Sequence, residues 1–442
     1  MNLPFFNKHL CLQAWSLSTL VICITGNAYA ALNDPTRDFP MTLEKAIKHT
    51  LAHNPQLHEF DVKQRIMKGE AKTAALKPRY ALGVEVENVL GSGEASGIKN
   101  LELTLTLSSV IEMGDKLHTR VNVTDVKREM LVVEKQVRSL DILAEVMRRY
   151  IDVLAEQETV NAVNDAEQLA RYTYQAVKRR VKAGASPLLE QKRAESALAA
   201  ARLILETAKL QWHTSIKSLS IMWGEQQPEF NQVQGDLFSF TKSPSLQALL
   251  STLSASPHIQ LFAQQSRVQD AKLRLTQTAN RPDISWTAGI RRISGIDETA
   301  FVAGASIPLF TESRNVGDYE AQKARLDQIE QQKLASLRNL YHQVNQSLDA
   351  RNRALLEVST FQQNIIPPLK EALVLVEKAY SDGRFSYLEW VFTRQELLDA
   401  QHALIQSAKQ AHQRGADIEA LTGISIVSLP SENTSIPIFD KK

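Results

Sequence analysis

The chain has 442 residues, of which 43% are hydrophobic, 6% aromatic and 23% charged, with a formal net charge of +2. This length predicts two units or one elongated unit rather than one small domain. The near-neutral charge, without a basic arm or an aromatic–basic platform, excludes the usual nucleic-acid-binding classes, so no nucleic-acid partner is expected.

Residues 1–30 are predicted to be a secretory signal peptide. The stretch from Leu10 to Ile24 is mostly apolar, and Ala28-Tyr29-Ala30 gives an A-x-A cleavage pattern before Ala31. We therefore expect cleavage between Ala30 and Ala31. The alternatives are a membrane anchor and a buried first helix, but the apolar run is shorter than the ~20 residues that span a bilayer.

Both cysteines, Cys11 and Cys23, fall inside the predicted signal. The mature chain is therefore expected to contain neither disulfides nor thiol chemistry. No later apolar run approaches the ~20 residues of a spanning helix. Insertion into a membrane would thus have to use β-strands, because only helices and closed barrels satisfy their backbone groups in lipid.

The rest of the chain consists of two similar halves. Asn54-Pro55 corresponds to Ser256-Pro257, and Ala183-Gly184 corresponds to Asp382-Gly383, at offsets of about 200 residues. This shared order of landmarks indicates an internal duplication. The predicted organisation is a first repeat over residues 41–225, a connector over 226–243, a second repeat over 244–424 and a C-terminal tail over 425–442.

Each half is predicted to contain a long helix and a returning helix. Asp115 to Ala183 contains neither Gly nor Pro, and its apolar residues from Val126 to Leu154 recur at alternating spacings of four and three. This heptad seam requires other helices beside it. The second half repeats the pattern from Asp318 to Ile366, after which Pro367-Pro368 must interrupt the helix or start a new one. The returning helices are expected from Leu188 to Trp223 and from about Phe385 to Arg414.

Four short segments of alternating polarity lie between the helices. The clearest alternates Leu101, Leu103, Leu105 and Leu107 with polar residues, and the others lie near 82–87, 284–291 and 301–309. Each has about the length of a tilted membrane strand. Four strands cannot close a barrel, so several chains would have to pool them. The alternative is a soluble sheet with one hydrated face.

Four stretches carry a family resemblance that covers roughly Thr42 to Gly423. They are the opening helix from Leu43 to Pro55, the strand exits Leu107 to Lys116 and Ala305 to Phe310, and the hairpin tip Tyr380 to Gly383 with Glu389. Together they resemble the TolC-like outer membrane factor family, most closely its cation-efflux (CzcC-like) branch. In the first strand exit, Asp115 replaces the second of the two glycines that this branch usually carries.

The resemblance implies a mainly α-helical fold with a small β part. In that family three protomers contribute four membrane strands each to a shared 12-stranded β-barrel, and duplicated helical hairpins form a trimeric α-helical tunnel in the periplasm. The channel contacts outer-membrane lipid and docks onto a periplasmic adaptor (membrane fusion) protein and an inner-membrane pump.

The function implied is a passive export duct, and heavy-metal or cation efflux with an RND-type pump fits the branch. A duct for type I protein or peptide secretion and a duct for drug efflux have the same fold. A periplasmic coiled-coil adaptor protein is the alternative from another class, although it would lack four membrane-length strands.

Two glutamates stand at matched offsets in the predicted hairpin turns. Glu190 follows Gly184 by six residues, and Glu389 follows Gly383 by six residues. Carboxylates arranged around an axis attract cations and repel anions. We therefore expect these two glutamates at the periplasmic entrance; the alternative is a pair of ordinary surface side chains.

The resemblance adds residues to this candidate entrance. Tyr380 and Arg384, together with Arg180, stand where relatives carry contacts that lock the tips. Phe392 replaces a second acidic position of some relatives. The turns at Gly184 and Gly383 are expected to contact the adaptor.

No motif for catalysis or cofactor binding occurs, since G-x-S-x-G, Walker and H-E-x-x-H patterns are absent from the sequence. The chain is therefore not expected to be an enzyme. His49 and His53 stand four apart on a predicted helix, a spacing that can bind a metal. A solvated helix face explains them equally well, and no metal site is assigned.

Overall fold

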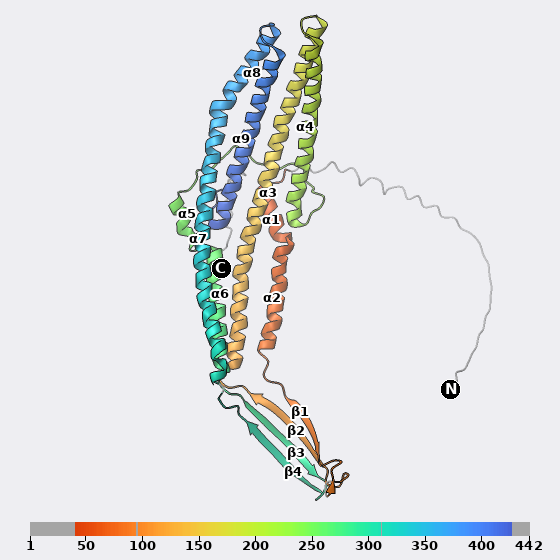
Figure 1. Cartoon of the computed structure of the whole chain (residues 1–442), viewed down its shortest axis with the longest axis vertical. Helices are drawn as coiled ribbons and strands as arrows, with labels where there is room; N and C mark the ends of the chain where they lie inside the picture. The colour runs from red at the N-terminus through yellow and green to blue at the C-terminus, as the bar shows by residue number, and fades with distance from the viewer. Residues whose placement is uncertain (1–39, 94–95, 311, 427–442) are drawn as a thin grey trace, which may run out of the picture. The chain divides into compact units, whose positions relative to one another are not determined.

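The computed structural model describes residues 40–93, 96–310 and 312–426 (Figure 1). The predicted signal peptide, with its cleavage site at Ala30 and Ala31, lies outside the described residues, as does the predicted tail beyond residue 426. The description below concerns the unit Phe39–Lys442, to which all described residues belong.

The two halves repeat one order of elements: two short helices, two strands, a long helix and a returning helix. The first half contains α1 (Leu43–His53), α2 (Pro55–Ala74), β1 (Ala81–Glu87), β2 (Glu102–Ile111), α3 (Lys116–Lys182), α4 (Leu188–Ser220) and the 3₁₀ turn η2 (Ile221–Trp223). The second contains α5 (Leu246–Leu253), α6 (Pro257–Ala279), β3 (Ile284–Ile293), β4 (Glu298–Ser306), η3 (Glu312–Asn315), α7 (Val316–Thr360), η4 (Phe361–Ile365), α8 (Ile366–Ser381) and α9 (Tyr387–Thr422).

The expected long helices are confirmed, with two differences. The second long helix changes into a π-helical segment, η4, at Phe361–Ile365, and α8 then starts with Pro367 and Pro368 in its first turn. A proline lacks the N–H that an α-helix needs, and the wider π turn accommodates that loss. The returning helix α9 extends past Arg414 to Thr422, because the first left-handed glycine that ends it is Gly423, with φ 73°.

The four expected strands form one antiparallel sheet in the order β1-β2-β3-β4. Leu105 is opposite Ile290, and Ile290 is opposite Phe301, so these side chains share one apolar face. Thr104 and Arg291 are paired on the other face, which is polar. The apolar face is open: Leu105 is 41% exposed and Phe301 is 93% exposed.

The main hydrophobic core joins the middle of α3 to α4, η2, α9 and the connector between the halves. Tyr150 and Ile151 on α3 are fully buried against Leu237 of the connector and Ala408 of α9. The Tyr150 hydroxyl lies within hydrogen-bond distance of the carbonyl oxygens of Met41 and Gln234, which share its single proton. Within the part of the chain that the structure describes, no helix is both long and apolar enough to cross a membrane.

Candidate channel entrance and strand-to-helix joint

Both helical hairpins reverse at a glycine in the left-handed region. Gly184 has a φ of 72° after α3, and Gly383 has a φ of 76° after α8. Glycine adopts this conformation without steric cost and therefore commonly ends helices. An added Cβ on Gly184 would meet no atom within 4 Å, so the backbone conformation, rather than close packing, requires this glycine.

The two hairpin ends contact each other through Arg180 and Tyr380. The Arg180 guanidinium donates from Nη1 to the Ser381 carbonyl oxygen at 2.6 Å. Its Cζ also lies 5.0 Å from the centroid of the Tyr380 ring, which is a cation–π distance. The side chain of Arg180, at the end of α3, thus links the turn of the first hairpin to the turn of the second.

Glu190 completes this contact between the hairpins. The Tyr380 hydroxyl donates to Glu190 Oε2 at 3.0 Å and lies 3.4 Å from Ser186 Oγ. Tyr380 is 3% exposed, and burial raises the pKa of its phenol above the ordinary value of 10. The phenol therefore stays protonated at neutral pH and remains a hydrogen-bond donor to the carboxylate.

Glu389 and Arg384 lie in the second turn without joining this contact. One Glu389 carboxylate oxygen accepts from the Ser386 backbone N–H at 2.8 Å and from Ser386 Oγ at 3.1 Å. With the return bond from Glu389 N–H to Ser386 Oγ, this is a capping box at the start of α9. Arg384 forms an exposed ion pair with Asp382. The structure therefore joins Glu190 to Tyr380 and leaves Glu389 on the exposed surface.

An aromatic cluster behind the turns was not part of the sequence prediction. The Tyr380 ring lies 5.2 Å from Trp390 and 6.5 Å from Tyr387, between ring centroids, and all three side chains are buried. Only the spacing of the two α9 residues signals this cluster in the sequence. Tyr387 and Trp390 are three residues apart and therefore share one helix face.

The histidine pair does not converge with other potential ligands. The rings of His49 and His53 are 6.2 Å apart between centroids, and His53 Nδ1 lies 3.1 Å from the His49 carbonyl oxygen. His49 instead packs edge-on against Trp223. Among the described residues, no group of three or more His, Cys, Asp or Glu side chains is arranged to hold a metal ion.

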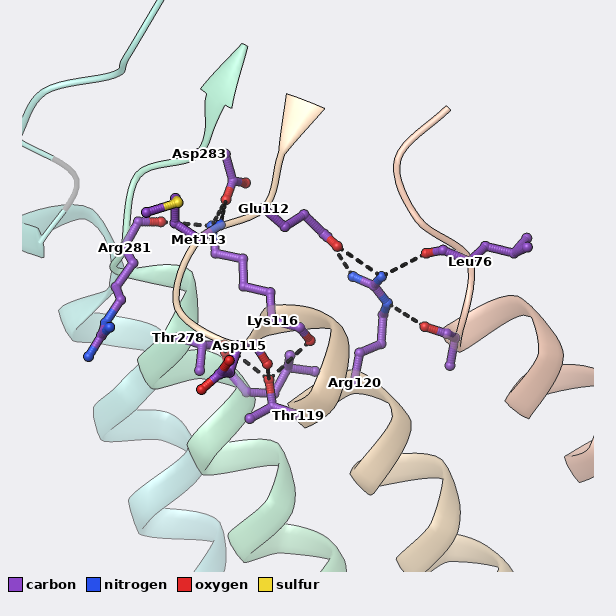
Figure 2. Close-up of polar contacts among 12 residues, drawn as sticks. Leu76, Glu112, Met113, Asp115, Lys116, Thr119, Arg120, Thr278, Arg281 and Asp283 are labelled. Atoms are coloured by element: carbon purple, nitrogen blue, oxygen red, sulfur yellow. Dashed lines mark hydrogen bonds and ion pairs between the residues drawn. The ribbon is translucent and has the colours of Figure 1, made fainter. Parts of the chain in front are cut away.

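A second polar cluster lies where the strands meet the helices (Figure 2). Lys116, at the start of α3, donates to Asp283 Oδ1 and to the Arg281 carbonyl oxygen, both at 2.7 Å. These contacts join the exit of β2 to the segment before β3. The Lys116 side chain is only 15% exposed, so the ion pair is partly shielded from water and salt.

Arg120 connects α3 to the end of α2 in the same cluster. It donates from Nη1 to Glu112 at 2.7 Å, from Nε to the Ala74 carbonyl at 2.9 Å and from Nη2 to the Leu76 carbonyl at 3.0 Å (Figure 2). The last carbonyl groups of a helix lack partners within it, and Arg120 supplies donors for this helix end. We call the contacts of Lys116 and Arg120 the strand-to-helix joint.

The backbone of the joint explains the glycine pattern of the first strand exit. Gly114 has a φ of 76°, and a Cβ added there would lie 2.3 Å from Arg281 Cδ. Asp115 follows with a φ of 60°, in the left-handed region. Glycine is the preferred residue in that region, while aspartate tolerates it better than most other residues.

Comparison with known proteins identifies the family. A profile described as outer membrane efflux protein matches residues 46–225 and 249–424. The cobalt-zinc-cadmium resistance protein CzcC of Cupriavidus metallidurans is 27% identical over 390 residues, which cover 87% of this chain and 90% of that protein. The nickel-cobalt-cadmium resistance protein NccC of Alcaligenes xylosoxydans xylosoxydans is 23% identical over 332 residues, 74% of each chain.

The fold has a close counterpart among solved structures. The crystal structure of CusC aligns with a TM-score of 0.71 at 16% sequence identity, covering 86% of this chain and 91% of CusC. The resemblance expected from the strand exits and hairpin tips is thereby confirmed at the level of the fold. Members of the matched family are outer-membrane efflux channels, not enzymes, that form trimers and work with an adaptor and an inner-membrane pump. Because the profile covers most of both halves, this chain belongs to the outer membrane efflux protein family, with its helical part in the periplasm.

Proposed function

We propose that this chain is the outer-membrane duct of a tripartite system that exports divalent heavy-metal cations. The duct is passive, and an inner-membrane pump of the RND type supplies the energy through a periplasmic adaptor. The relatives CzcC and NccC are named for resistance to cobalt, zinc, cadmium and nickel, and CzcC aligns over 90% of its length. These names support metal cations rather than drugs or peptides as the cargo.

The open apolar face of the sheet is the observation that best supports a membrane duct. A soluble sheet buries its apolar face, yet Phe301 is 93% exposed and Leu82 is 71% exposed. Large exposed apolar patches indicate contact with lipid or protein. The strand order leaves β1 and β4 as edges, and lipid does not tolerate open edges. Three copies that pool their strands in one closed barrel satisfy both requirements.

The hairpin turns are proposed to form the periplasmic entrance. In a threefold assembly, Glu389 would contribute exposed carboxylates near the axis, whereas Glu190 is engaged by Tyr380. Phe392 is 66% exposed one turn further along α9, so Glu389 has no acidic neighbour at that position. The turns at Gly184 and Gly383 would face the adaptor.

The substrate class can be tested in the host cell. Deletion of the gene should sensitise cells to cobalt, zinc, cadmium or nickel, and the intact gene should restore resistance. Sensitivity to drugs should change little, because the partner pump is specific for metals. A deletion strain that is sensitive to drugs or fails to secrete a protein, while it keeps its metal resistance, would contradict the proposed cargo.

The entrance can be tested in planar bilayers. Glu389→Gln should lower the preference for cations and weaken block by trivalent cations, because it removes exposed charge. Glu190→Gln should have less effect, because that carboxylate accepts the Tyr380 hydroxyl. Reversal potentials that both substitutions leave unaltered, in correctly assembled channels, would identify the two residues as ordinary surface glutamates.

A further inference from the structure

The charged side chains on the polar face of the sheet gather at one end. Two cross-strand rows nearest the β1–β2 and β3–β4 connections carry all the charge of this face within the described strands. The rows closer to the helices carry only small or uncharged side chains. The two charged rows are Glu85–Thr104–Arg291–Ala300 and Glu87–Glu102–Ile293–Glu298.

Arg291 is the single basic residue among these two rows, and it is held against the sheet. Its Nη2 lies 3.0 Å from Glu87 Oε2, and its Nη1 lies 2.9 Å from Glu102 Oε2. Its Nε donates to Thr104 Oγ1 at 3.0 Å. The guanidinium therefore lies along the wall and contacts both β2 and β1. We call this arrangement the Arg291 clamp.

The burial of Thr104 agrees with that geometry. Thr104 lies on the polar face of the sheet, yet it is only 1% exposed. The Arg291 side chain is 31% exposed and the Glu102 side chain is 22% exposed. Hydrogen bonds between charged partners are stronger than neutral ones, and the planar guanidinium can satisfy several acceptors at once.

The clamp determines the charge that this end of the sheet presents. Arg291 carries one positive charge and its partners Glu87 and Glu102 carry two negative charges, so the clamp has a net charge of −1. Glu85 and Glu298 remain exposed on the same face. A released guanidinium would extend away from the wall on a long side chain. It would then place a positive charge in the path of a cation.

We propose that Arg291 is a specificity-determining residue of the duct. Held by Glu87 and Glu102, its positive charge stays against the wall, so that the loop end of the lumen remains net negative and its centre unobstructed; released, it opposes cations. The inference rests on the proposed function, in which three copies of the sheet enclose the path of a cation. The expected consequence is that the position of the guanidinium, as well as the formal charge, sets the preference for cations.

Two double variants with the same formal charge separate these effects. Glu87→Gln/Glu102→Gln removes two carboxylates and releases Arg291. The matched control Glu85→Gln/Glu298→Gln removes two carboxylates and leaves the clamp intact. In planar bilayers under a salt gradient, the clamp-breaking variant should shift the reversal potential toward anions by about twice as much as the control, since it also moves a positive charge toward the axis.

Block by lanthanum(III) locates the effect at one end. The ion is added to either compartment, on channels whose orientation is set by adding protein from one side. From the loop side, Arg291→Gln should need about tenfold less lanthanum for half block, as expected for the loss of one unit charge per protomer roughly a Debye length away. The clamp-breaking variant loses two unit charges per protomer and should need about a hundredfold more. Block from the helix side should be unchanged.

The outcomes distinguish this inference from the proposed function. Equal shifts in the two double variants, or block unaltered by Arg291→Gln, would overturn the role of Arg291 and leave the duct standing. Absence of any conductance from the intact, assembled protein would overturn the duct itself. If the clamp-breaking variant does not assemble, Arg291→Lys decides, because it keeps every formal charge but replaces the guanidinium that contacts Glu87, Glu102 and Thr104 at once with a mobile ammonium. It should lower the preference for cations, and an unaltered reversal potential would overturn the role of Arg291.

Discussion

The two helical hairpins share a chain reversal but differ along their length. In the first hairpin, α3 runs without interruption from Lys116 to Lys182. In the second, the corresponding helix is divided by the π segment Phe361–Ile365 and by Pro367 and Pro368 (Figure 1). The second hairpin thus contains a local irregularity that the first lacks, although both end at a left-handed glycine.

The glutamates at the matched offset show how far the two copies have diverged. Glu190 accepts a hydrogen bond from Tyr380 of the other hairpin, whereas Glu389 caps its own helix through Ser386. The first turn has Pro187 at the N-cap position, which offers no side-chain cap. Its glutamate is therefore available for a contact between hairpins. Equal spacing after a turn fixes the place of a carboxylate in the chain but not its partner.

The largest effect is expected from a proline placed in the unbroken helix. Gln168 lies as far before Gly184 as Pro367 lies before Gly383, and its side chain is exposed. Gln168→Pro should cost about 3 kcal/mol per protomer or more, because it removes a hydrogen bond and clashes with the preceding turn. Pro367→Ala should change stability by less than about 1 kcal/mol, since proline fits the first turn of α8. Denaturant unfolding followed by circular dichroism measures both, and equal costs would contradict the contrast between the helices.

A pH effect should arise from a buried histidine of the second hairpin. His412 on α9 is 3% exposed, its ring stacks on Phe240 at 4.6 Å between centroids, and its Nε2 lies 3.0 Å from the Leu237 carbonyl. Burial, with a further contribution from Arg351, lowers the pKa of His412 to about 4. The folded state therefore favours the neutral ring, whereas the unfolded state takes up a proton near the ordinary pKa of 6.5.

The contribution of neutral His412 to the free energy of unfolding should therefore be fully present above about pH 6.5. It should fall by about 2–3 kcal/mol per protomer as the pH decreases to about 4. His412→Gln should flatten this dependence. The control is His213→Gln, because His213 lies as far past Gly184 as His412 lies past Gly383, and it is exposed. Denaturation midpoints at neutral and acidic pH provide the measurement. An undiminished acid loss in His412→Gln would show that another group is responsible.

A smaller effect is expected from the contact between the hairpins. Tyr380→Phe removes the hydroxyl that donates to Glu190. It should cost about 1.5–2 kcal/mol, in the lower part of the range of about 1.5–3 kcal/mol for a hydrogen bond to a charged group, because Glu190 is only half-buried. Tyr341→Phe, at a 37% exposed position on α7, should be neutral. Thermal unfolding of the two variants measures the difference. Equal midpoints would remove the energetic distinction between Glu190 and Glu389.

The smallest effect concerns the first strand exit, at Gly114 and Asp115 of the strand-to-helix joint. Asp115→Gly should stabilise the protein by up to about 1 kcal/mol, because glycine relieves the left-handed conformation but gains entropy when unfolded. Gly114→Ala should instead destabilise it, because the added Cβ would meet Arg281 at 2.3 Å. Denaturant midpoints of the two variants should therefore move in opposite directions, and movement in one direction would argue against this account of the joint.

Periodicity made much of the fold predictable. The segment from Asp115 to Ala183, free of Gly and Pro, corresponds to α3 within one residue at each end, and the leucine alternation around Leu105 indicated the correct apolar face. These patterns are local, so each helix or strand can be predicted from the residues of its own segment. The predicted end of α9 at about Arg414 is wrong: Gly415 lies within the helix, which continues to Thr422.

The candidate site was less predictable because its contacts join distant parts of the chain. Lys116 pairs with Asp283, and Tyr380 with Glu190. No local pattern marks such partners, because only the packed arrangement of the hairpins and strands brings them together. Arg291 could be assigned to the polar face from alternation alone, but its position against the wall depends on Glu87 and Glu102 of two other strands.

The mass of the intact assembly in a mild detergent tests the central claim most directly. The open sheet edges and the exposed apolar face require neighbours, and the proposed duct requires that those neighbours are copies of this chain. Native mass spectrometry of protein extracted from outer membranes should show three chains per particle. A fully helical and stable single chain under the same conditions would contradict both the shared barrel and the tunnel.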